Sequence, residues 1–428
     1  MTHAMTTMPK YESYKDSGFE WLKEVPSHWE LLRLGSRFEE RRTKVSDKDF
    51  APLSVTKMGI VPQLDSAAKT NDGDNRKLVK KGDFVINSRS DRKGSSGIAF
   101  QDGSVSLINT VLHPKEIHPT YCNYLLKSNG FVEEFYRMGH GIVADLWTTR
   151  YDEMSSIILG IPTLEEQEAI AKFLDEKTVQ IDEAIGIKER QIALLKERKQ
   201  IIIQNAVTKG LNPNAPMKDS GVDWIGDIPS HWEVRKLKHL SKINRSALSE
   251  NTAKDFQFDY VDISNVTFEN GIENADTYTF SNAPSRARRI AKAGDTIVST
   301  VRTYLKAIDY INDEKCHYIF STGFAVVEPR NFVHPEYLTR FISSNAFTNQ
   351  VDTEAKGVSY PAINSTELGN LSIALPPMNE MREITGYINL HMAQMNTAIE
   401  KQKQQIINLR EYKASLINSA VTGKIKVI

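Results

Sequence analysis

The hydrophobic positions of two long segments recur in alternating steps of four and three residues. The second segment has this pattern at Ile388, Met392, Met395, Ile399, Gln402, Ile406, Leu409, Lys413 and Leu416. Subtracting 214 gives the pattern of the first: Leu174, Thr178, Ile181, Ile185, Lys188, Ile192, Leu195, Lys199 and Ile202. Such steps place the side chains along one stripe of a helix and are typical of coiled coils. The two segments are predicted to be helices that pair with each other.

Capping residues and prolines set the limits of these helices. Pro162 precedes Thr163–Glu166, a capping box in which the Thr hydroxyl and the Glu carboxylate can each satisfy a free N–H. In the second segment Asn379 is the expected N-cap, and no proline follows it. Long helices are therefore predicted over 163–210 and 377–424. At a rise of about 1.5 Å per residue, each would be roughly 65–70 Å long. An antiparallel pair would hold the domains between them at opposite ends.

The rest of the chain consists of short apolar runs that Gly, Pro, Asn and Asp interrupt. Asp83–Asn87, Thr296–Thr300 and Gly323–Val327 are predicted to be strands. His118-Pro119 and His334-Pro335 are predicted to open helices, because proline fits the first helical turn. These segments favour an α+β fold.

The chain repeats one unit twice. "DSGFEWLKEVPSHWE" from Asp16 returns as "DSGVDWIGDIPSHWE" from Asp219, an offset of 203. Three further pairs of phrases follow in the same order: Gly-Asp phrases, His-Pro phrases and "AVT" endings, at offsets of 212, 216 and 214. Most of the drift lies before the Gly-Asp phrase, so the frame is constant while an insert varies. The C-terminal "GKIKVI" is expected near the first opening phrase. The predicted order is an α+β domain (11–162), a long helix (163–210), a second α+β domain (211–376) and a second long helix (377–424).

Composition adds limits of a general kind. The 428 residues are 40% hydrophobic and 25% charged, which is typical of a folded protein with two or three domains. The two cysteines, Cys122 and Cys316, have no metal-site spacing and indicate a reducing compartment. We find neither a signal peptide nor a membrane span and expect a cytoplasmic protein. The 54 basic and 54 acidic residues leave the choice of partner open.

Two basic clusters lie at corresponding places in the two units. Residues 76–93 contain seven basic and two acidic side chains, and residues 286–306 contain six and one. Such clusters supply the salt-dependent part of DNA affinity, and Arg can bond guanine O6 and N7 together. A solvated basic face is the plain alternative. The candidate DNA contacts are Arg76, Lys77, Arg89, Arg92, Lys93, Arg286, Arg288, Arg289, Arg302, Tyr304 and Lys306.

The sequence offers little for catalysis. Ser27-His28 and Ser230-His231 lie in the opening phrases, but neighbouring Ser and His cannot form a triad by adjacency. The chain has no Gly-x-x-x-x-Gly-Lys-Ser/Thr loop for phosphates. It also lacks the Asp/Asn-Pro-Pro-Tyr/Phe loop with which amino-methyltransferases hold an extruded base. The opening phrases contain four of the five tryptophans, which are predicted to be packing anchors. No catalytic, cofactor-binding or metal-binding residue is predicted.

The duplicated order of these motifs resembles the specificity subunits of type I restriction–modification systems over essentially the whole chain. The resemblance is carried by the opening phrases, the Gly-Asp strands, "IPTLEEQEAIAKFLDE" and "LPPMNEMREITGYIN" at the helix starts, and the "AVTKG" and "AVTGK" endings. One departure is that Asn379-Glu380-Met381 lacks the Glu-Gln pair of Glu166-Gln167.

The resemblance implies a DNA-reading role. Each α+β domain would be a target recognition domain for one half of a bipartite double-stranded site. The helices would separate the domains and dock two copies of a modification subunit, which binds S-adenosylmethionine and methylates adenine. Restriction subunits, motor nucleases that use ATP and Mg²⁺, would cut unmodified DNA. The chain itself would be non-catalytic and without a cofactor.

A coiled-coil scaffold that does not read DNA is the alternative. It explains the helices but not the paired basic clusters. Modular recognition predicts that exchanging residues from about Lys242 to Ala374 with another family member changes one half of the target. Inserting helical turns into both helices is expected to alter the spacer between the halves.

Overall fold

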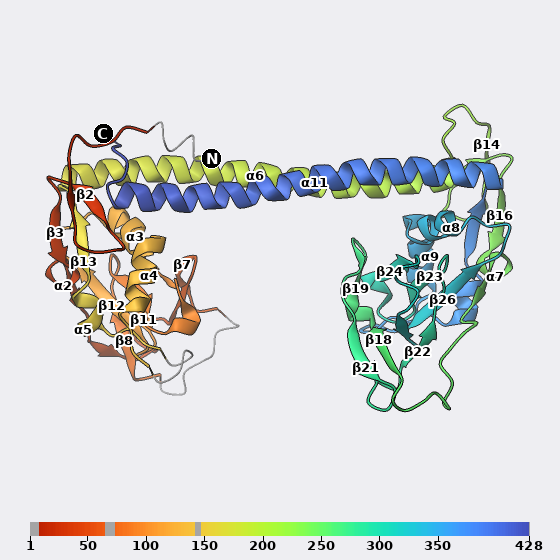
Figure 1. Cartoon of the computed structure of the whole chain (residues 1–428), viewed down its shortest axis with the longest axis horizontal. Helices are drawn as coiled ribbons and strands as arrows, with labels where there is room; N and C mark the ends of the chain where they lie inside the picture. Colours follow the sequence, from red (N-terminus) through yellow and green to blue (C-terminus); the bar gives the residue numbers. More distant parts are fainter. Residues whose placement is uncertain (1–7, 65–72, 142–146, 428) are drawn as a thin grey trace. The chain divides into compact units, whose positions relative to one another are not determined.

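The chain folds into two compact units that mix helices and sheets (Figure 1). The computed structural model describes residues 8–64, 73–141 and 147–427. Unit 1 combines Met1–Glu189 with Lys403–Ile428, and unit 2 is Arg190–Gln402. Each unit thus contains part of both long helices, and the predicted α+β fold class is confirmed. Among the described residues, no helix is long and apolar enough to cross a membrane.

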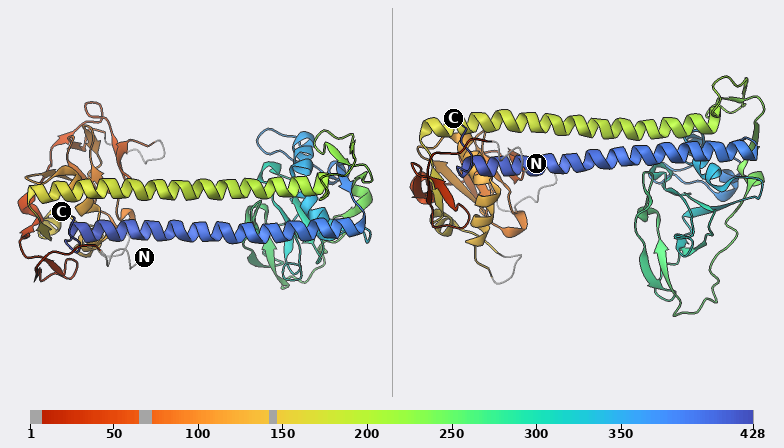
Figure 2. Two further views of the ribbon diagram at one scale, coloured as in Figure 1. Left: turned by 90° about the horizontal axis from the view of Figure 1, so that it is seen from above. Right: turned by 45° about the horizontal axis from the view of Figure 1, so that its top comes forward.

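The two long helices are α6 (Leu164–Lys209) and α11 (Met378–Val421). Their predicted stripes are buried or half-buried along their length; Leu174 and Ile388, for example, are fully buried. Within each unit the segments of α6 and α11 run side by side (Figures 1 and 2). The predicted pairing within the chain is therefore confirmed.

Lysines that interrupt the hydrophobic stripe find polar partners on the opposite helix. In unit 1 Lys413 Nζ lies 2.6 Å from Asp182 Oδ2, and Lys188 Nζ donates to Gln405 Oε1 at 2.5 Å. In unit 2 Lys199 Nζ lies 2.8 Å from Asn396 Oδ1. The partner on α11 moves toward its N-terminus as the α6 residue number rises, so the helices run antiparallel in both units.

Unit 1 has two main sheets, with strand orders β10-β9-β12-β4 and β11-β8-β5. Strand pairs β1-β2, β3-β13 and β6-β7 complete it. Its strands are β1 (Tyr14–Asp16), β2 (Glu24–Pro26), β3 (Glu30–Arg33), β4 (Phe38–Glu40), β5 (Lys44–Val45), β6 (Leu53–Thr56), β7 (Gly59–Pro62), β8 (Arg76–Val79), β9 (Phe84–Asn87), β10 (Ser96–Ile98), β11 (Gly103–Val105), β12 (Asn109–Pro114) and β13 (Ile158–Ile161). Its shorter helices are α2 (Leu34–Arg37), η1 (Ser90–Arg92), α3 (Pro119–Lys127), α4 (Asn129–Arg137) and α5 (Tyr151–Ser155).

Unit 2 repeats this frame. Its sheet β24-β23-β26-β17 has the order of β10-β9-β12-β4, and β16-β27 and β14-β15 correspond to β3-β13 and β1-β2. Its strands are β14 (Met217–Asp219), β15 (Asp227–Pro229), β16 (Glu233–Lys236), β17 (Ser241–Ile243), β18 (Gln257–Val261), β19 (Val266–Thr267), β20 (Gly271–Ile272), β21 (Asp276–Thr279), β22 (Ala287–Ile290), β23 (Thr296–Ser299), β24 (Ile308–Tyr310), β25 (Ile319–Ser321), β26 (Phe324–Pro329) and β27 (Ser372–Leu375). Its shorter helices are α7 (Leu237–Leu240), η3 (Ile263–Asn265), η4 (Thr303–Leu305), α8 (Pro335–Ile342), α9 (Asn345–Glu354) and α10 (Ser365–Gly369).

The units differ in the segment that the sequence identified as variable. Between β4 and β8, unit 1 has the β6-β7 hairpin, whereas unit 2 has β18 to β21 between β17 and β22. Strand β18 pairs parallel with β25 over two residue pairs, whereas the described part of unit 1 has one isolated parallel bridge there, between Pro52 and Ser104. The predicted strands and His-Pro helices match β9, β23, β26, α3 and α8.

The opening phrases fasten each unit to the start of a long helix. Trp29 is fully buried, and its Nε1 lies 3.0 Å from Glu166 Oε1, while His28 Nε2 lies 2.9 Å from Glu166 Oε2. In unit 2 His231 and Trp232 contact Glu380 in the same way, at 2.8 and 3.0 Å. The Ser-His phrase therefore has a structural role, because it lies in the segment that anchors each opening phrase to the start of a long helix.

The other two tryptophans of the phrases behave differently. Trp21 is half-buried and meets Phe131 edge to face at 6.2 Å. Trp224 is 47% exposed. The predicted packing role is confirmed for the buried pair and is wrong for Trp224.

The helix starts correct two details of the prediction. The Glu166 N–H does donate to Thr163 Oγ1, at 3.3 Å, but the Glu166 carboxylate receives the opening phrase instead of completing a capping box. In the second helix, Asn379 lies in the first turn and is not the N-cap, because α11 already begins at Met378.

The departure at the second helix start is confined to one residue. Glu380 takes the place of Glu166, and Met381 takes the place of Gln167. The His118 N–H donates to Gln167 Oε1 at 2.8 Å, and the His334 N–H lies 3.4 Å from Met381 Sδ. A weak sulfur acceptor thus replaces an amide oxygen at an equivalent contact.

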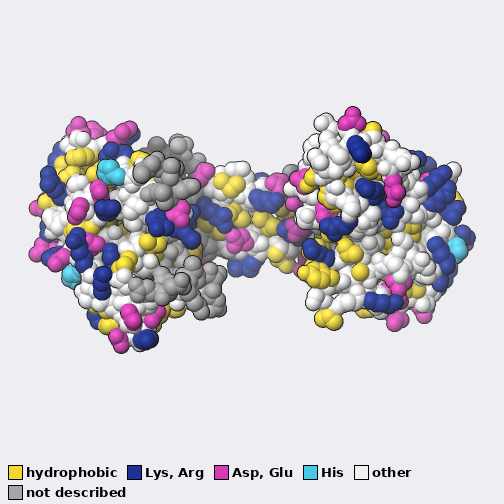
Figure 3. Space-filling model, turned by 90° about the horizontal axis from the view of Figure 1, so that it is seen from below, with side chains coloured by type: hydrophobic (Ala, Val, Ile, Leu, Met, Phe, Trp, Pro, Cys, Tyr) yellow, Lys and Arg dark blue, Asp and Glu magenta, His cyan; other side chains and the backbone are white. Residues whose placement is uncertain are grey.

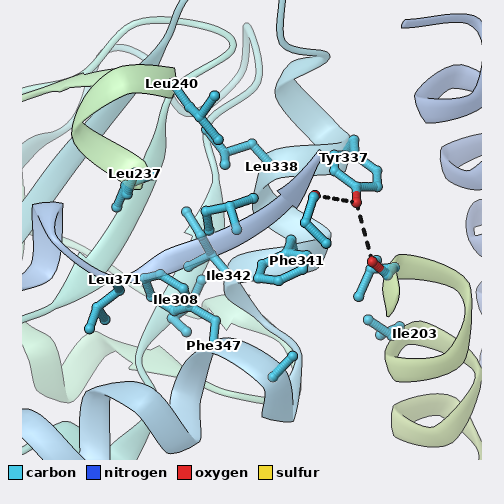
Figure 4. Close-up of a cluster of buried hydrophobic side chains, with 14 of the residues drawn as sticks. Ile203, Leu237, Leu240, Ile308, Tyr337, Leu338, Phe341, Ile342, Phe347 and Leu371 are labelled. Carbon is cyan, nitrogen blue, oxygen red and sulfur yellow. Dashed lines mark hydrogen bonds between the residues drawn. The ribbon is translucent and has the colours of Figure 1, made fainter. Parts of the chain in front are cut away.

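Each His-Pro helix binds the end of the opposite long helix. The Tyr337 hydroxyl donates to the backbone oxygens of Val207 and Ala374, at 3.2 and 2.8 Å (Figure 4). In unit 1 the Tyr121 hydroxyl lies 3.4 Å from the Val421 oxygen. Around Tyr337, Ile203 of α6 joins the largest apolar cluster of unit 2. These contacts satisfy carbonyls that a helix end leaves free.

The C-terminal residues return to the first opening phrase, as expected. Lys424 Nζ donates to the backbone oxygens of Leu22 and Glu24. Gly423, with φ of 72°, would bring a Cβ to 2.3 Å from Pro26, so only glycine fits there. The final residue, Ile428, lies outside the described residues.

The Gly-Asp phrases form the turn before the central strand. Asp83 accepts the N–H of Lys80, and Asp295 accepts that of Lys292, at 2.8 and 2.7 Å. Asp83 also receives two hydrogen bonds from Arg41.

Asn244 occupies the place of Arg41 in unit 2. The Arg41 N–H donates to the Val111 oxygen of β12, and the Asn244 N–H donates to the Val326 oxygen of β26, the equivalent strand. Burial raises the pKa of Asp295 to about 6.

Asp295→Asn is expected to stabilise the protein at pH 8. Because the folded pKa lies above the ordinary value of 3.8, the folded state loses stability as pH rises from about 4 to about 6. The variant should therefore gain about 1 to 3 kcal/mol at pH 8 and little near pH 4. Urea unfolding at both pH values measures this. Asp83→Asn, which strips Arg41 of its partner, should instead destabilise at pH 8, and equal effects of the two variants would contradict the explanation.

Candidate nucleic-acid interface

A short 3-10 turn carries basic residues at both ends in each unit. In unit 1, η1 follows β9, with Arg89 before it and Lys93 after it. In unit 2, η4 follows β23, with Arg302 before it and Lys306 after it. Four of the predicted DNA contacts thus occupy equivalent places, which the repeat alone had indicated only approximately.

A second segment, distant in the sequence, is pinned to each turn. In unit 1 the Ser90 N–H donates to the Trp147 oxygen at 3.1 Å. In unit 2 the Thr303 N–H lies 3.4 Å from the Pro361 oxygen. The segment that contains this acceptor forms an antiparallel bridge in each unit, between His140 and Thr148 in unit 1 and between Lys356 and Ala362 in unit 2.

Sequence reasoning missed this pairing. Its signal was present, because Gly141 and Gly357 follow His140 and Lys356 at the same offset of 216 as the His-Pro phrases.

Beside η1, unit 1 has a cleft of about 520 Å³. Arg89 and Lys77 line it together with three basic residues that the sequence analysis did not single out: Arg42, Lys44 and Arg150. The five basic residues come from three segments of the chain (42–44, 77–89 and 150), and only the folded structure brings them together. Five cations on one cleft suit an anionic ligand such as a phosphate backbone.

The charges of this cleft are partly compensated. Glu40 lies 3.1 Å from Lys77 Nζ and 2.6 Å from Arg42 Nε. Among the described residues, none forms an ion pair with Lys44, Arg89 or Arg150. These three cations are therefore the ones most available to a ligand.

Other candidates in unit 1 divide between the surface and the interior. Arg76 is only 4% exposed, and it bonds the hydroxyl and the backbone oxygen of Ser104, at 2.8 and 3.0 Å. Burial lowers its pKa. Arg92 is exposed, with its Nε 3.6 Å from its neighbour Asp91, and Lys93 pairs with Glu133 at 2.6 Å. Arg76 thus has a structural role and does not lie on the surface.

In unit 2 the basic residues lie against aromatic rings. The guanidinium carbon of Arg302 lies 5.3 Å from the centre of the Tyr360 ring, and that of Arg288 lies 4.8 Å from Phe280. Lys306 Nζ lies 5.8 Å from Phe268.

The remaining candidates of unit 2 differ in exposure. Tyr304 is 56% exposed, and Arg286 is exposed with Asp262 at 3.5 Å. Arg289 is half-buried, and burial lowers its pKa. Arg288 is half-buried as well, so Arg286 is the most exposed of these three arginines.

On the face that Figure 3 shows, basic and acidic side chains are interspersed in each unit. Affinity would then depend on particular residues, which is why the paired turns matter more than net charge.

Comparison with known proteins gives a consistent result. A family described as "Type I restriction modification DNA specificity domain" matches residues 229–409. The type I restriction enzyme MjaVIII specificity subunit of Methanocaldococcus jannaschii is 24% identical over 97% of each chain. The putative MjaX specificity subunit of the same organism is 22% identical, over 97% of this chain and 98% of its own.

Solved structures share the fold. One chain, from a structure that describes complex assembly and conformational transition of the type I R-M system, has a TM-score of 0.67 and 15% identity. It covers 93% of this chain and 98% of itself. The HsdS subunit from Thermoanaerobacter tengcongensis has a TM-score of 0.53 and 15% identity, covering 94% and 98%. These matches confirm the resemblance and the fold.

Proposed function

We propose that this chain reads a bipartite double-stranded DNA target as the non-catalytic subunit of a type I restriction–modification complex. Two findings support the proposal: residues 229–409 match the type I restriction modification DNA specificity domain, and a chain of a solved type I R-M system shares the fold. The observation that carries the proposal is the basic turn repeated in both units, Arg89 with Lys93 and Arg302 with Lys306. Two similar but unequal reading sites suit a target with two different halves.

The partners follow from the same proposal. Two copies of a modification subunit would bring S-adenosylmethionine to the DNA and methylate adenine, and restriction subunits would use ATP and Mg²⁺ for translocation and cleavage. This chain would supply the sequence choice. Phosphate contacts would come from Lys44, Arg92, Arg150 and Lys306, and base contacts from residues on the turns.

Methylome sequencing of cells that carry this chain with its modification subunit tests the proposal. The expected result is one methylated motif in two parts, separated by a spacer of fixed length. Cells with the modification subunit alone are the control. Methylation without this chain, or a single undivided motif, would contradict the proposed function.

Salt dependence separates DNA reading from a scaffold that does not touch DNA. Replacing Arg89, Arg92, Arg302 and Lys306 by Gln in the complex with the modification subunit should weaken DNA binding. For every phosphate that these side chains neutralise, the replacement should flatten the slope of log affinity against log salt by about 0.9. Arg235→Gln is the control, because Arg235 is exposed but paired with Glu233 at 2.8 Å. An unchanged slope in the fourfold variant would exclude these turns as the interface.

A further inference from the structure

The backbone of the unit 2 turn is held in an unusual conformation. Arg302 and Lys306 have φ of 53° and 47°, in the left-handed region that residues other than glycine rarely adopt. Hydrogen bonds on both sides of the turn impose this conformation. The Ile363 N–H donates to the Thr300 oxygen at 2.8 Å, and the Ser299 N–H donates to the Ala307 oxygen at 2.9 Å. Such strain persists where the surroundings enforce it, and it is concentrated at functional sites.

The side chain of Arg302 is also held. Its guanidinium lies over Tyr360, which is 65% exposed and belongs to the hairpin Lys356–Ala362. Gly357 shapes this hairpin: its φ is 110°, and a Cβ there would lie 3.0 Å from the Tyr360 oxygen. Among the described residues, no carboxylate forms an ion pair with Arg302. The Tyr360 ring therefore orients the planar guanidinium of Arg302, and no carboxylate among the described residues neutralises it.

A fixed orientation matters for reading bases more than for holding phosphates. Guanine presents O6 and N7 in one plane of the major groove, and two parallel N–H groups of one guanidinium match them. A phosphate can be met by any mobile cation near the backbone, such as Lys306 on the same turn.

From this geometry we propose that Arg302 reads a guanine in the half-site of unit 2 and that Tyr360 is the residue that positions it. The inference rests on the proposed function and assigns one base-reading residue within it.

Unit 1 provides an internal comparison. Arg89 holds the same place but has φ of −90°, and its neighbour along the turn, Ser90, is pinned as in unit 2. Within the described part of unit 1, no aromatic ring lies under the Arg89 guanidinium. Arg89 thus shares the position but not the fixed orientation, and the two units need not read their halves alike.

The test is selection from a pool of duplexes with random sequence, bound by the complex of the full chain with its modification subunit. Wild type is compared with Arg302→Lys, which keeps the positive charge but loses the two parallel N–H groups of the guanidinium. At one G·C position of one half-site, the wild-type preference should fall by on the order of tenfold or more. All other positions and the second half-site should keep their preferences.

Further variants separate positioning from general damage. Tyr360→Phe keeps the ring face and should retain the preference, whereas Tyr360→Ala should relax the same position as Arg302→Lys. Arg235→Lys serves as the control for losing a guanidinium elsewhere in unit 2. Arg89→Lys should leave the half-site of unit 2 untouched.

Each outcome has a defined meaning. A uniform loss of affinity in Arg302→Lys, with every base preference intact, would make Arg302 a phosphate contact and overturn the inference while leaving the proposed function in place. Relaxation by Tyr360→Phe as strong as by Tyr360→Ala would overturn the positioning role of the ring. If the wild-type complex enriches no sequence, the proposed function fails and the inference fails with it.

Discussion

Replacing Ser241–Asn370 by the corresponding segment of a type I restriction enzyme specificity subunit is expected, under the proposed function, to change one half of the methylated motif and leave the other half as it was. The segment holds the variable strands β18 to β21, the η4 turn and the hairpin that carries Tyr360. The opening phrase, the pair β16-β27 and both long helices stay in place. Base contacts would be exchanged within an unchanged frame.

These limits correct the segment from Lys242 to Ala374 that the sequence suggested for exchange. Ala374 lies in β27, where it pairs with Val234 of β16, and its oxygen accepts the Tyr337 hydroxyl. A junction there would combine one native and one foreign strand in the same ladder and lose register. The donor should keep a tyrosine at the position of Tyr337.

Methylome sequencing of cells with the exchanged chain measures the result. Exchanging the same segment with a donor of identical half-site specificity is the control for damage at the junctions. A change of both halves, or of the spacer, would contradict the assignment of one half-site to unit 2.

Glu166→Ala is expected to destabilise the protein by about 3 kcal/mol or more. Glu166 is 6% exposed and accepts hydrogen bonds from Tyr11, His28 and Trp29. Without the carboxylate, the fully buried indole N–H of Trp29 would have no acceptor, and the opening phrase would lose its hold on α6. Urea unfolding measures the loss.

Two further variants test this explanation, one as a control and one at the equivalent carboxylate of unit 2. Glu165→Ala changes the exposed neighbour of Glu166 and should cost no more than about 0.5 kcal/mol. Glu380→Ala removes the equivalent carboxylate, whose side chain is 20% exposed and which accepts hydrogen bonds from His231 and Trp232; it should cost about 1 to 3 kcal/mol. If Glu166→Ala and Glu165→Ala lost equal stability, the fastening role would be excluded.

Much of the frame could be predicted because it depends on local and periodic signals. The four-and-three steps of Ile388 to Leu416 require a helix with one apolar stripe, and the duplicated phrases require two similar units. The Gly-Asp and His-Pro phrases predicted strands and helices for the same reason: turn and capping chemistry acts between neighbours. These signals remain readable without knowledge of the tertiary structure.

The candidate site could be predicted only in part. Arg76 and Arg89 belong to one basic run, yet Arg76 is buried against Ser104 while Arg89 lines the cleft. Arg76 lies in β8, where its side chain is buried, whereas Arg89 follows the end of β9 and begins the η1 turn; the basic run by itself does not show where a strand ends. Arg42 and Arg150 were overlooked because they lie far from that run in the sequence.

By itself, the sequence determined the family resemblance, the repeated frame and the long helices, since these follow from periodicity and from phrases that recur along the chain. Only the tertiary structure decided that Glu166 holds the opening phrase, that Met381 replaces Gln167, and that Tyr360 lies under Arg302, 58 positions away. Such contacts join residues distant in sequence, and their formation depends on the packing of whole sheets and helices, which no local pattern encodes.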